Sequence, residues 1–233
     1  MSIKKGDFVE IEYTGKTQDG FIFDTTSEET ARQNNIFNER YTYGPVIICI
    51  GEAQVLKGID KQLEGKSEGS FTADIQADDA FGRKSAKLLR MIPLSAFKKQ
   101  NIMPHPGLQL NMDGVIGTVK TVQGGRTIVD FNHPLASKDL VYDLKVNRIV
   151  TDDVEKIKSY VQLQLSQKGI QVKVEGSEVA VALQFPIPKE YTDKVAAKLK
   201  ELTGKEVTFH EPKAEEPKEA KDAQIQEGAE SNK

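Results

Sequence analysis

The sequence predicts an α+β protein built from several small parts, and three observations lead to that prediction. Apolar residues alternate in short segments of the first 150 residues, as at Val9, Ile11 and Tyr13, which indicates strands with one buried face. Apolar residues recur at helical spacing in residues 151–210. The chain has 233 residues, enough for one large domain or two to three small ones, and its 38% apolar and 29% charged content is ordinary for a globular protein.

The first 150 residues predict a curved antiparallel sheet packed on a single helix. Alternating segments recur at 71–75 and 142–146, and one helix is expected around "LKGIDKQLEG" at 56–65. Residues 84–131 interrupt this pattern, because "LLRMIPLSAFKKQNIMPHPGLQL" has its apolar residues in short pieces broken by three Pro. A hairpin is expected about Gly124-Gly125. We therefore predict a small β-rich domain inserted at 84–131.

Residues 151–210 predict a separate C-terminal α-β-β-α-β domain. Asp152 and Glu155 have the spacing of a helix capping box, and Gly169 is expected to end that helix. Two alternating segments then predict a hairpin, and a second amphipathic helix and a last strand follow. About sixty residues is near the lower limit for independent stability, so we expect docking onto the rest of the chain or a homodimer through this domain.

The last segment, 211–233, predicts a disordered acidic tail. It holds seven acidic residues, four Lys and two Pro, and Ile225 is its only large apolar residue. Such a segment cannot bury enough surface to offset its chain entropy. A solvated tail is the main interpretation, and a docking arm is the alternative.

Composition excludes several classes of function. A formal net charge of −3 gives no case for a nucleic-acid partner. The single Cys, Cys49, excludes an intrachain disulfide framework and a zinc site built on several Cys, and its apolar neighbours predict a buried side chain. The N-terminus has no apolar core of a signal peptide, and no apolar run could span a bilayer. We expect a cytoplasmic protein that makes no contact with membranes.

Four separated motifs resemble one known family. "VEIEYTGKTQDGFIFDTT", "GEAQVLKGIDKQLEGKSEG", "DDAFG" and "LVYDLKV" occur in the order and spacing of FKBP-type peptidyl-prolyl cis-trans isomerases. The interruption after "AFG", followed by "NHPLASKDL", resembles the SlyD-like branch, in which an insert-in-flap domain replaces the flap loop. The C-terminal block resembles that of the long-type archaeal members. The resemblance covers residues 1–150 well and the C-terminal block only weakly.

This resemblance implies an isomerase with an antiparallel half-barrel around one helix, formed by residues 1–83 and 132–150. It also implies an apolar pocket for a prolyl peptide between sheet and helix. Matched by motif, the pocket residues are Tyr13, Phe23, Asp24, Val55, Leu56, Ile59, Phe81 and Tyr142. Val46 and Ile48 fall where the family often places further wall residues. The segment 27–44 resembles the bulge of archaeal members, and its role is left open.

Prolyl isomerisation needs neither a metal nor a cofactor, so none is expected. It needs preferential binding of a twisted amide, for which Tyr13 can offer a hydroxyl and Leu56 a backbone N–H. We interpret Asp24 as a positioning residue and not as a general base. From pattern alone, the apolar residues of the set could be ordinary core and Asp24 a turn residue. His133 and His105 are interpreted as structural and loop residues, because the three His residues lie far apart in the sequence.

Two residues depart from the family pattern. The pocket floor, often Trp in the family, is Ile59, and the aromatic residue of the "AYG" motif is Phe81, without a hydroxyl. Both changes remove polar or stacking contacts without removing the apolar surface. We expect isomerase activity to be retained and affinity for macrolide inhibitors to be reduced.

The insert predicts a second function, in which it binds unfolded chains and presents their prolines to the isomerase site. The partners are then unfolded or partly folded polypeptides. Each candidate contact could equally belong to the core of the insert; the candidates are Leu88, Leu89, Met91, Ile92, Phe97, Ile102 and Met103. The rival hypothesis is a holdase chaperone with little isomerase activity. A third, an adaptor that docks through the C-terminal block, rests only on its α+β pattern.

Overall fold

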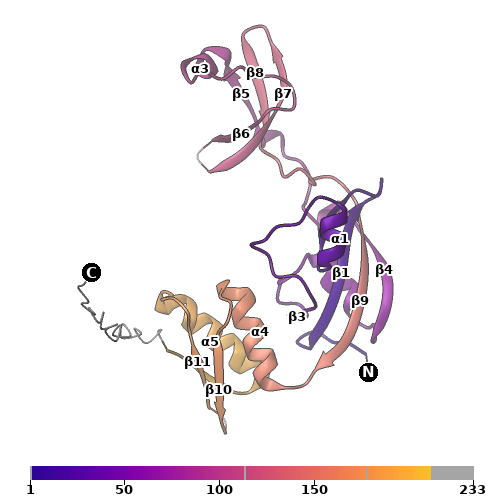
Figure 1. The fold of residues 1–233 in the computed structure, drawn as a ribbon, viewed down its shortest axis with the longest axis vertical. Coiled ribbons are helices and arrows are strands. Elements are labelled where there is room, and N and C mark those ends of the chain that lie inside the picture. The colour runs from indigo at the N-terminus through magenta and orange to yellow at the C-terminus, as the bar shows by residue number, and fades with distance from the viewer. Residues whose placement is uncertain (1, 113, 177, 211–233) are drawn as a thin grey trace, which may run out of the picture.

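The computed structural model describes residues 2–112, 114–176 and 178–210, and these form three separate sheets with few helices (Figure 1). This is the mixed fold class that the sequence predicts. The segment 211–233, for which we predicted a disordered tail, lies outside the described residues.

The first sheet is antiparallel, with the order β2-β1-β9-β4, and β3 pairs with β1 as well. The strands are β1 (Phe8–Thr17), β2 (Ile22–Thr25), β3 (Val46–Cys49), β4 (Gly69–Ile75) and β9 (Leu140–Val150). A short 3-10 helix, Ala77–Asp79, follows β4. The neighbouring strands β4 and β9 are far apart in the sequence, so the segment between them leaves this sheet and returns to it.

One face of this sheet packs on α2 (Lys57–Leu63). Alternate residues of β1 and β9 turn toward the helix, where Ile59 and Leu63 are buried in the same core. Gly58 allows the close approach, because a Cβ at this position would lie 2.2 Å from Cγ2 of Ile75 on β4. The sequence therefore positions this helix through one apolar stripe and one glycine.

The prediction of a single helix in the first 150 residues was wrong. Two more helices occur, α1 (Glu28–Gln33) in the bulge and α3 (Leu94–Lys99). The Ser27 side chain caps α1 by accepting from the Thr30 N–H at 3.2 Å, and Ala31 is its only buried residue. A helix of six residues with one buried side chain has no apolar periodicity to detect.

A second, four-stranded antiparallel sheet lies between β4 and β9 in the sequence. Its strands are β5 (Leu89–Pro93), β6 (Gln109–Met112), β7 (Val115–Gln123) and β8 (Arg126–Asp130), in the order β5-β8-β7-β6, and a 3-10 helix, Ala86–Leu88, precedes β5. The predicted hairpin at Gly124-Gly125 is confirmed: both residues have positive φ, 57° and 74°, between the paired Gln123 and Arg126. Figure 1 shows this sheet set apart from the rest and joined to it by two connecting segments.

The C-terminal block forms a three-stranded sheet and two helices. Its elements are α4 (Asp153–Leu165), β10 (Gln171–Glu175), β11 (Glu178–Ala182), α5 (Lys189–Thr203) and β12 (Glu206–His210), and β11 and β12 are parallel. Asp152 caps α4 by accepting from the Glu155 N–H at 2.8 Å, as expected. None of the helices in the described part of the chain is long and apolar enough to cross a membrane.

The prediction that Gly169 ends the first C-terminal helix was wrong, because α4 ends at Leu165 with Ser166 at φ 51°. The fully buried Gln167 explains the earlier end. Its side chain donates to the Phe185 carbonyl at 2.9 Å and accepts from the Gln184 N–H at 2.7 Å. These two bonds hold the chain against the segment after β11.

The C-terminal block shares its core with the first sheet. Phe8, Cys49 and Val150 of that sheet are buried together with side chains of α4, α5 and β11. The prediction that Cys49 is buried is confirmed, since it is 0% exposed, and burial raises the pKa of its thiol to about 12. Part of the C-terminal core is therefore supplied by β1, β3 and β9.

Candidate functional site

Four aromatic side chains of the predicted site form one continuous cluster on the α2 side of the first sheet. The rings of Tyr13 and Tyr142 are 5.9 Å apart between centroids, and Phe23 meets Tyr142 edge-on at 5.9 Å and 79°. Phe81 meets Phe23 edge-on at 6.2 Å. Edge-to-face packing is favourable for aromatic pairs and leaves little freedom to any one ring. Strands β1, β2 and β9 and the segment after β4 thus converge on one apolar surface.

Gly15 makes this convergence possible, although we did not single it out from the sequence. A Cβ at this position would lie 2.7 Å from Cζ of Tyr142 and 3.0 Å from Cζ of Phe23. The pairing of β1 with β2 also shifts register between Gly15 and Lys16. The "YTGK" motif therefore supplies both an aromatic residue and the space that its neighbours occupy.

Apolar residues at the start of α2 complete the cluster. Val55 and Leu56 are half-buried and pack against the same core, and Ile59 is 2% exposed within it. Of the further candidates, Val46 is half-buried and Ile48 is fully buried in this core. In the described part of the chain, the Leu56 N–H donates no hydrogen bond.

A carboxylate lies at the polar edge of the cluster. The Asp24 carboxyl follows Phe23 on β2 and lies near enough to Tyr13 for its charge to raise the pKa of the Tyr13 hydroxyl. Partial desolvation raises the pKa of Asp24, and its polar neighbours Tyr13 and the Thr25 N–H oppose this effect, while the residue itself is exposed on β2. Burial and the nearby Asp24 charge raise the pKa of Tyr13 and of Tyr142, so both phenols stay protonated at neutral pH. The edge therefore combines a carboxylate acceptor with two phenols.

His133 extends the cluster, which the sequence analysis missed. Its ring stacks on Phe81 at 4.1 Å and 9°, and its Nδ1 accepts from the Leu135 N–H at 3.2 Å. The only signal in the sequence was the position of His133, shortly after β8, where the chain leaves the second sheet and returns to the first. The described residues hold no group of three or more His, Cys, Asp or Glu side chains that could bind a metal ion.

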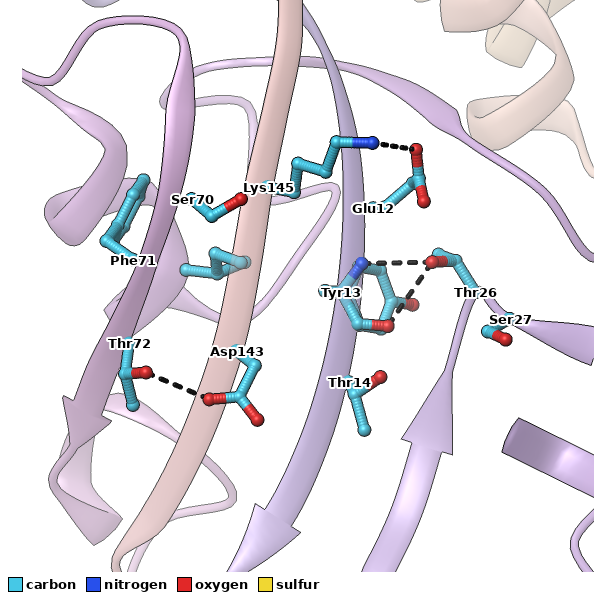
Figure 2. A pocket seen from close by; sticks show the side chains of 11 residues that line it. Glu12, Tyr13, Thr14, Thr26, Ser27, Ser70, Phe71, Thr72, Asp143 and Lys145 are labelled. Atoms are coloured by element: carbon cyan, nitrogen blue, oxygen red, sulfur yellow. Dashed lines mark hydrogen bonds and ion pairs between the residues drawn. The ribbon is translucent and has the colours of Figure 1, made fainter. Parts of the chain in front are cut away.

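A separate concavity of about 440 Å³ lies over the first sheet (Figure 2). Its charged side chains alternate along β1 and β9 with those that face α2, so they belong to the opposite face. They are already paired: Lys145 bonds Glu12 at 3.2 Å, and Asp143 accepts from Thr72 at 2.9 Å and from Lys16 at 2.6 Å. Because these groups satisfy one another, we assign this concavity no chemistry.

The candidate contacts of the insert divide into exposed and buried residues. Leu88, Leu89, Met91 and Met103 are exposed. The assignment of Phe97 as a surface contact was wrong, since it is 5% exposed, and Ile92 and Ile102 are half-buried against it in the small core of the insert. Amphipathic spacing cannot separate these roles in a short segment. Three further apolar residues are exposed and were not predicted as contacts, namely Met112, Val115 and Ile116.

Comparison with known proteins agrees with this geometry. A family described as FKBP-type peptidyl-prolyl cis-trans isomerase matches residues 1–97, and a family described as FKBP26, IF domain, matches residues 90–135. A probable FKBP-type 16 kDa peptidyl-prolyl cis-trans isomerase of Pseudomonas fluorescens is 31% identical over 108 residues, which cover 44% of this chain and 71% of the relative. The chain belongs to the FKBP-type peptidyl-prolyl cis-trans isomerase family, and it is an isomerase.

Two further relatives match a longer stretch. A short-type peptidyl-prolyl cis-trans isomerase of Methanocaldococcus jannaschii is 29% identical over 148 residues, 63% of this chain and 94% of the relative. The SlyD isomerase of Haemophilus influenzae is 28% identical over 151 residues, 63% of this chain and 72% of the relative. A crystal structure of the three FKBP domains of wheat FKBP73 has a TM-score of 0.35 at 16% identity, over 65% of this chain and 42% of that one.

Proposed function

We propose that the chain rotates X-Pro bonds of folding polypeptides at the aromatic cluster, with residues 1–83 and 132–150 as the isomerase domain. One observation carries this proposal: the side chains of Tyr13, Phe23, Phe81 and Tyr142 form one surface edged by Asp24. Family members act on prolyl polypeptides, and this surface is apolar enough to receive a proline ring.

The mechanism follows from the energy barrier to rotation about the X-Pro amide bond. An amide must lose its resonance to rotate, at a cost of about 18–20 kcal/mol, so a catalyst has to bind the twisted amide better than the planar one. A dry aromatic surface favours the less polar twisted state. The N–H of Leu56 can hold a peptide carbonyl, because it has no partner among the described residues. Fixed donors of this kind stabilise the twisted state without reorganising.

Asp24 acts as a positioning residue in this mechanism. Its carboxylate lies near the Tyr13 hydroxyl at the edge of the cluster, and its task in this proposal is to orient that ring. The reaction transfers no proton, so a general base has no task. Tyr142 is 2% exposed, so its ring supports Tyr13 and Phe23 from within the cluster.

We further infer that residues 84–131 form an insert-in-flap domain that binds unfolded chains. The match of residues 90–135 to the IF domain family supports this, as does the number of large apolar side chains that the insert exposes. Their exposure follows from size, because a core of three buried residues, Phe97, Val119 and Val129, cannot cover the remaining apolar surface.

The test is proline-limited refolding of a small protein with catalytic amounts of the full chain. We expect acceleration at sub-stoichiometric concentration. Asp24→Asn and Tyr142→Leu should reduce turnover of a short prolyl peptide by about tenfold or more, since each removes a contact to the reacting segment or its support. Asp74→Asn and Tyr41→Leu are matched controls, because both side chains are exposed and lie outside the cluster.

The rival function is a holdase with little isomerase activity. The exposed apolar residues of the insert favour it, since they would bind unfolded chains whether or not the cluster turns over. Retarded refolding, or no effect until the chain is equimolar with its substrate, would support the holdase and contradict the isomerase site.

A further inference from the structure

The sheet of the insert has one covered face and one open face. Phe97 of α3 packs with Val119 and Val129 on the covered face, and Ile92 lies against them. Side chains alternate along a strand, so the neighbours of these residues point to the other side. These neighbours include Leu89 and Met91 on β5, which are 46% and 60% exposed. We call this side the open face.

The open face combines apolar and cationic side chains. Ile116 on β7 adds a side chain that is 63% exposed. Arg126 alternates with the buried Thr127 and therefore lies on the same side, and it is exposed. Lys120 belongs there too, because its Nζ lies 3.9 Å from Oδ2 of Asp130, whose neighbour Val129 faces the core.

The charge of the insert is strongly one-sided. Residues 84–131 contain seven Lys and Arg and two Asp, a formal net charge of +5, whereas the whole chain carries −3. All seven basic residues are exposed. Within the described residues, the ion pairs of the insert involve a single carboxylate, Asp130, with Lys84 at 3.7 Å and Lys120 at 3.9 Å.

Asp130 offsets only one of the seven positive charges of the insert. Its side chain is 7% exposed, and it accepts from the N–H of Asn132 at 2.9 Å and from the side-chain amide of Asn132 at 2.7 Å. Its role is to hold the start of the segment that returns to the first sheet. The exposed side chains around it leave the open face with a net positive charge.

We propose that the open face selects unfolded segments in which acidic residues neighbour apolar ones. This rests on the proposed function of the insert and adds the class of its client. Apolar side chains of the client contact Leu89, Met91 and Ile116, and its carboxylates lie near Lys120 and Arg126. Complementary charge speeds encounter and favours partners of the opposite sign, while apolar contact holds the segment on the surface.

Three labelled peptides without proline test the preference, because they cannot use the isomerase site. They share the same Leu, Phe and Met residues, separated by Glu, Gln or Lys. Fluorescence anisotropy with the full chain should rank affinity in the order Glu, Gln, Lys. We expect the Glu peptide to bind roughly three- to tenfold more tightly than the Lys peptide at low salt, and the ratio to fall at high salt.

A pair of double variants locates the effect. Lys120→Gln with Arg126→Gln should abolish most of the preference for the Glu peptide over the Lys peptide. Asp130 is not left unpaired in this variant, because Lys84 remains its partner. Lys98→Gln with Lys99→Gln removes the same charge from α3, on the covered side, and should leave the preference unchanged. Equal effects of the two double variants, or equal binding of the Glu and Lys peptides, would overturn the proposal.

The same measurements separate failure of the proposed client class from failure of the proposed function. If the Gln peptide binds as well as the Glu peptide, the client class is wrong but the binding function of the insert stands. If no peptide binds and unfolded protein is not retained either, the proposed function itself fails. A single-stranded oligonucleotide that displaces the Glu peptide at equal concentration would show a general polyanion site, and it would also overturn the proposal.

Discussion

The insert and the C-terminal block are of similar size, yet they solve the problem of a small core in opposite ways. Among its described residues, the insert buries Phe97, Val119 and Val129 as its core and leaves seven large apolar side chains exposed. The C-terminal block packs against Phe8, Cys49 and Val150 of the first sheet and so gains a larger core. A domain near the size limit either borrows apolar surface from a neighbour or exposes its own. A core shared with a neighbouring sheet is suited to structural support, and exposed apolar side chains are suited to a binding surface.

Polar contacts reinforce this difference. Tyr160 of α4 bonds Glu52 at 3.1 Å, and Lys198 of α5 pairs with the same carboxylate at 3.1 Å. Glu52 lies in the loop that leads to Val55 and Leu56, and Ala53 in this loop has a positive φ of 54°. The C-terminal block therefore also holds the loop before the candidate site.

The largest expected effect on stability comes from removing one aromatic side chain from the core of the C-terminal block and one from the core of the insert. Phe8→Ala and Phe97→Ala should each cost about 3–5 kcal/mol of local stability. Because Phe8 packs on Tyr160 at 6.3 Å between centroids, its loss should lower hydrogen-exchange protection in both the first sheet and the C-terminal block. Phe97→Ala should lower protection in the insert alone. Loss of protection confined to the C-terminal block in Phe8→Ala would show that the two parts unfold independently.

Exposed apolar side chains allow the insert and the C-terminal block to be compared in their binding of unfolded protein. Met91→Ser should weaken binding of a permanently unfolded protein by roughly three- to tenfold, since Met91 is 60% exposed and its burial by a client contributes on the order of 1 kcal/mol. Its effect on the unfolding free energy should stay within about 0.5 kcal/mol. Leu163→Ser, at a 42% exposed position of α4, is the control. Equal weakening by both variants would mean that binding is not specific to the insert.

The bond between Tyr160 and Glu52 predicts a smaller effect. Tyr160→Phe should lower the unfolding free energy by about 1 kcal/mol, because it removes a hydrogen bond to a carboxylate that still keeps Lys198. Tyr191→Phe serves as the control, since that side chain is 59% exposed. Urea denaturation of both variants measures the difference. No change in Tyr160→Phe would show that this bond does not help to hold the C-terminal block.

The smallest expected effects concern two buried carboxylates, Asp60 and Asp130, whose contributions to the free energy of unfolding change with pH in opposite directions. Burial raises the pKa of Asp60, although N–H groups of Gly51 and Ala53 oppose it. Its folded pKa is above the unfolded value, so its contribution to stability falls as the pH rises from about 4 through the raised pKa. Burial alone would raise the pKa of Asp130, but hydrogen bonds from Asn132 and the charges of Lys84 and Lys120 lower it below the ordinary value.

The contribution of Asp130 is therefore present above its unfolded pKa and is lost as the pH falls through its lowered folded pKa. Urea denaturation between about pH 3 and pH 6 should show the wild type losing stability relative to Asp60→Asn as the pH rises, and gaining it relative to Asp130→Asn. Each change should be about 1 kcal/mol or less. The same sign for both variants would contradict the assigned causes.

Local patterns predicted a large part of the molecule. The alternation in β1, β4 and β9, the Gly124-Gly125 hairpin and the Asp152 cap all depend on residues close in the sequence, and the structure agrees with them. The helix end at Leu165 and the helix α1 were predicted wrongly, because the first depends on distant partners of Gln167 and the second has almost no buried face.

The candidate site was predicted only through motifs and not through pattern. Periodicity could mark Tyr13 and Tyr142 as inward-facing, but it could not show that their rings meet across β1 and β9. Gly15 escaped notice and His133 was interpreted only as a structural residue for the same reason, since their importance lies in which rings they adjoin. Within the insert, both the residues that become core and those that stay exposed are large and apolar.

The sequence by itself determined most strands, most helices and the family, because these are recorded in short-range periodicity and in motifs. Only the tertiary structure decided which surfaces are shared. Phe8 and Cys49 belong to the core of the C-terminal block, and Leu89 and Met91 belong to no core at all. Burial depends on what a distant segment brings against a side chain, and no local pattern contains that information.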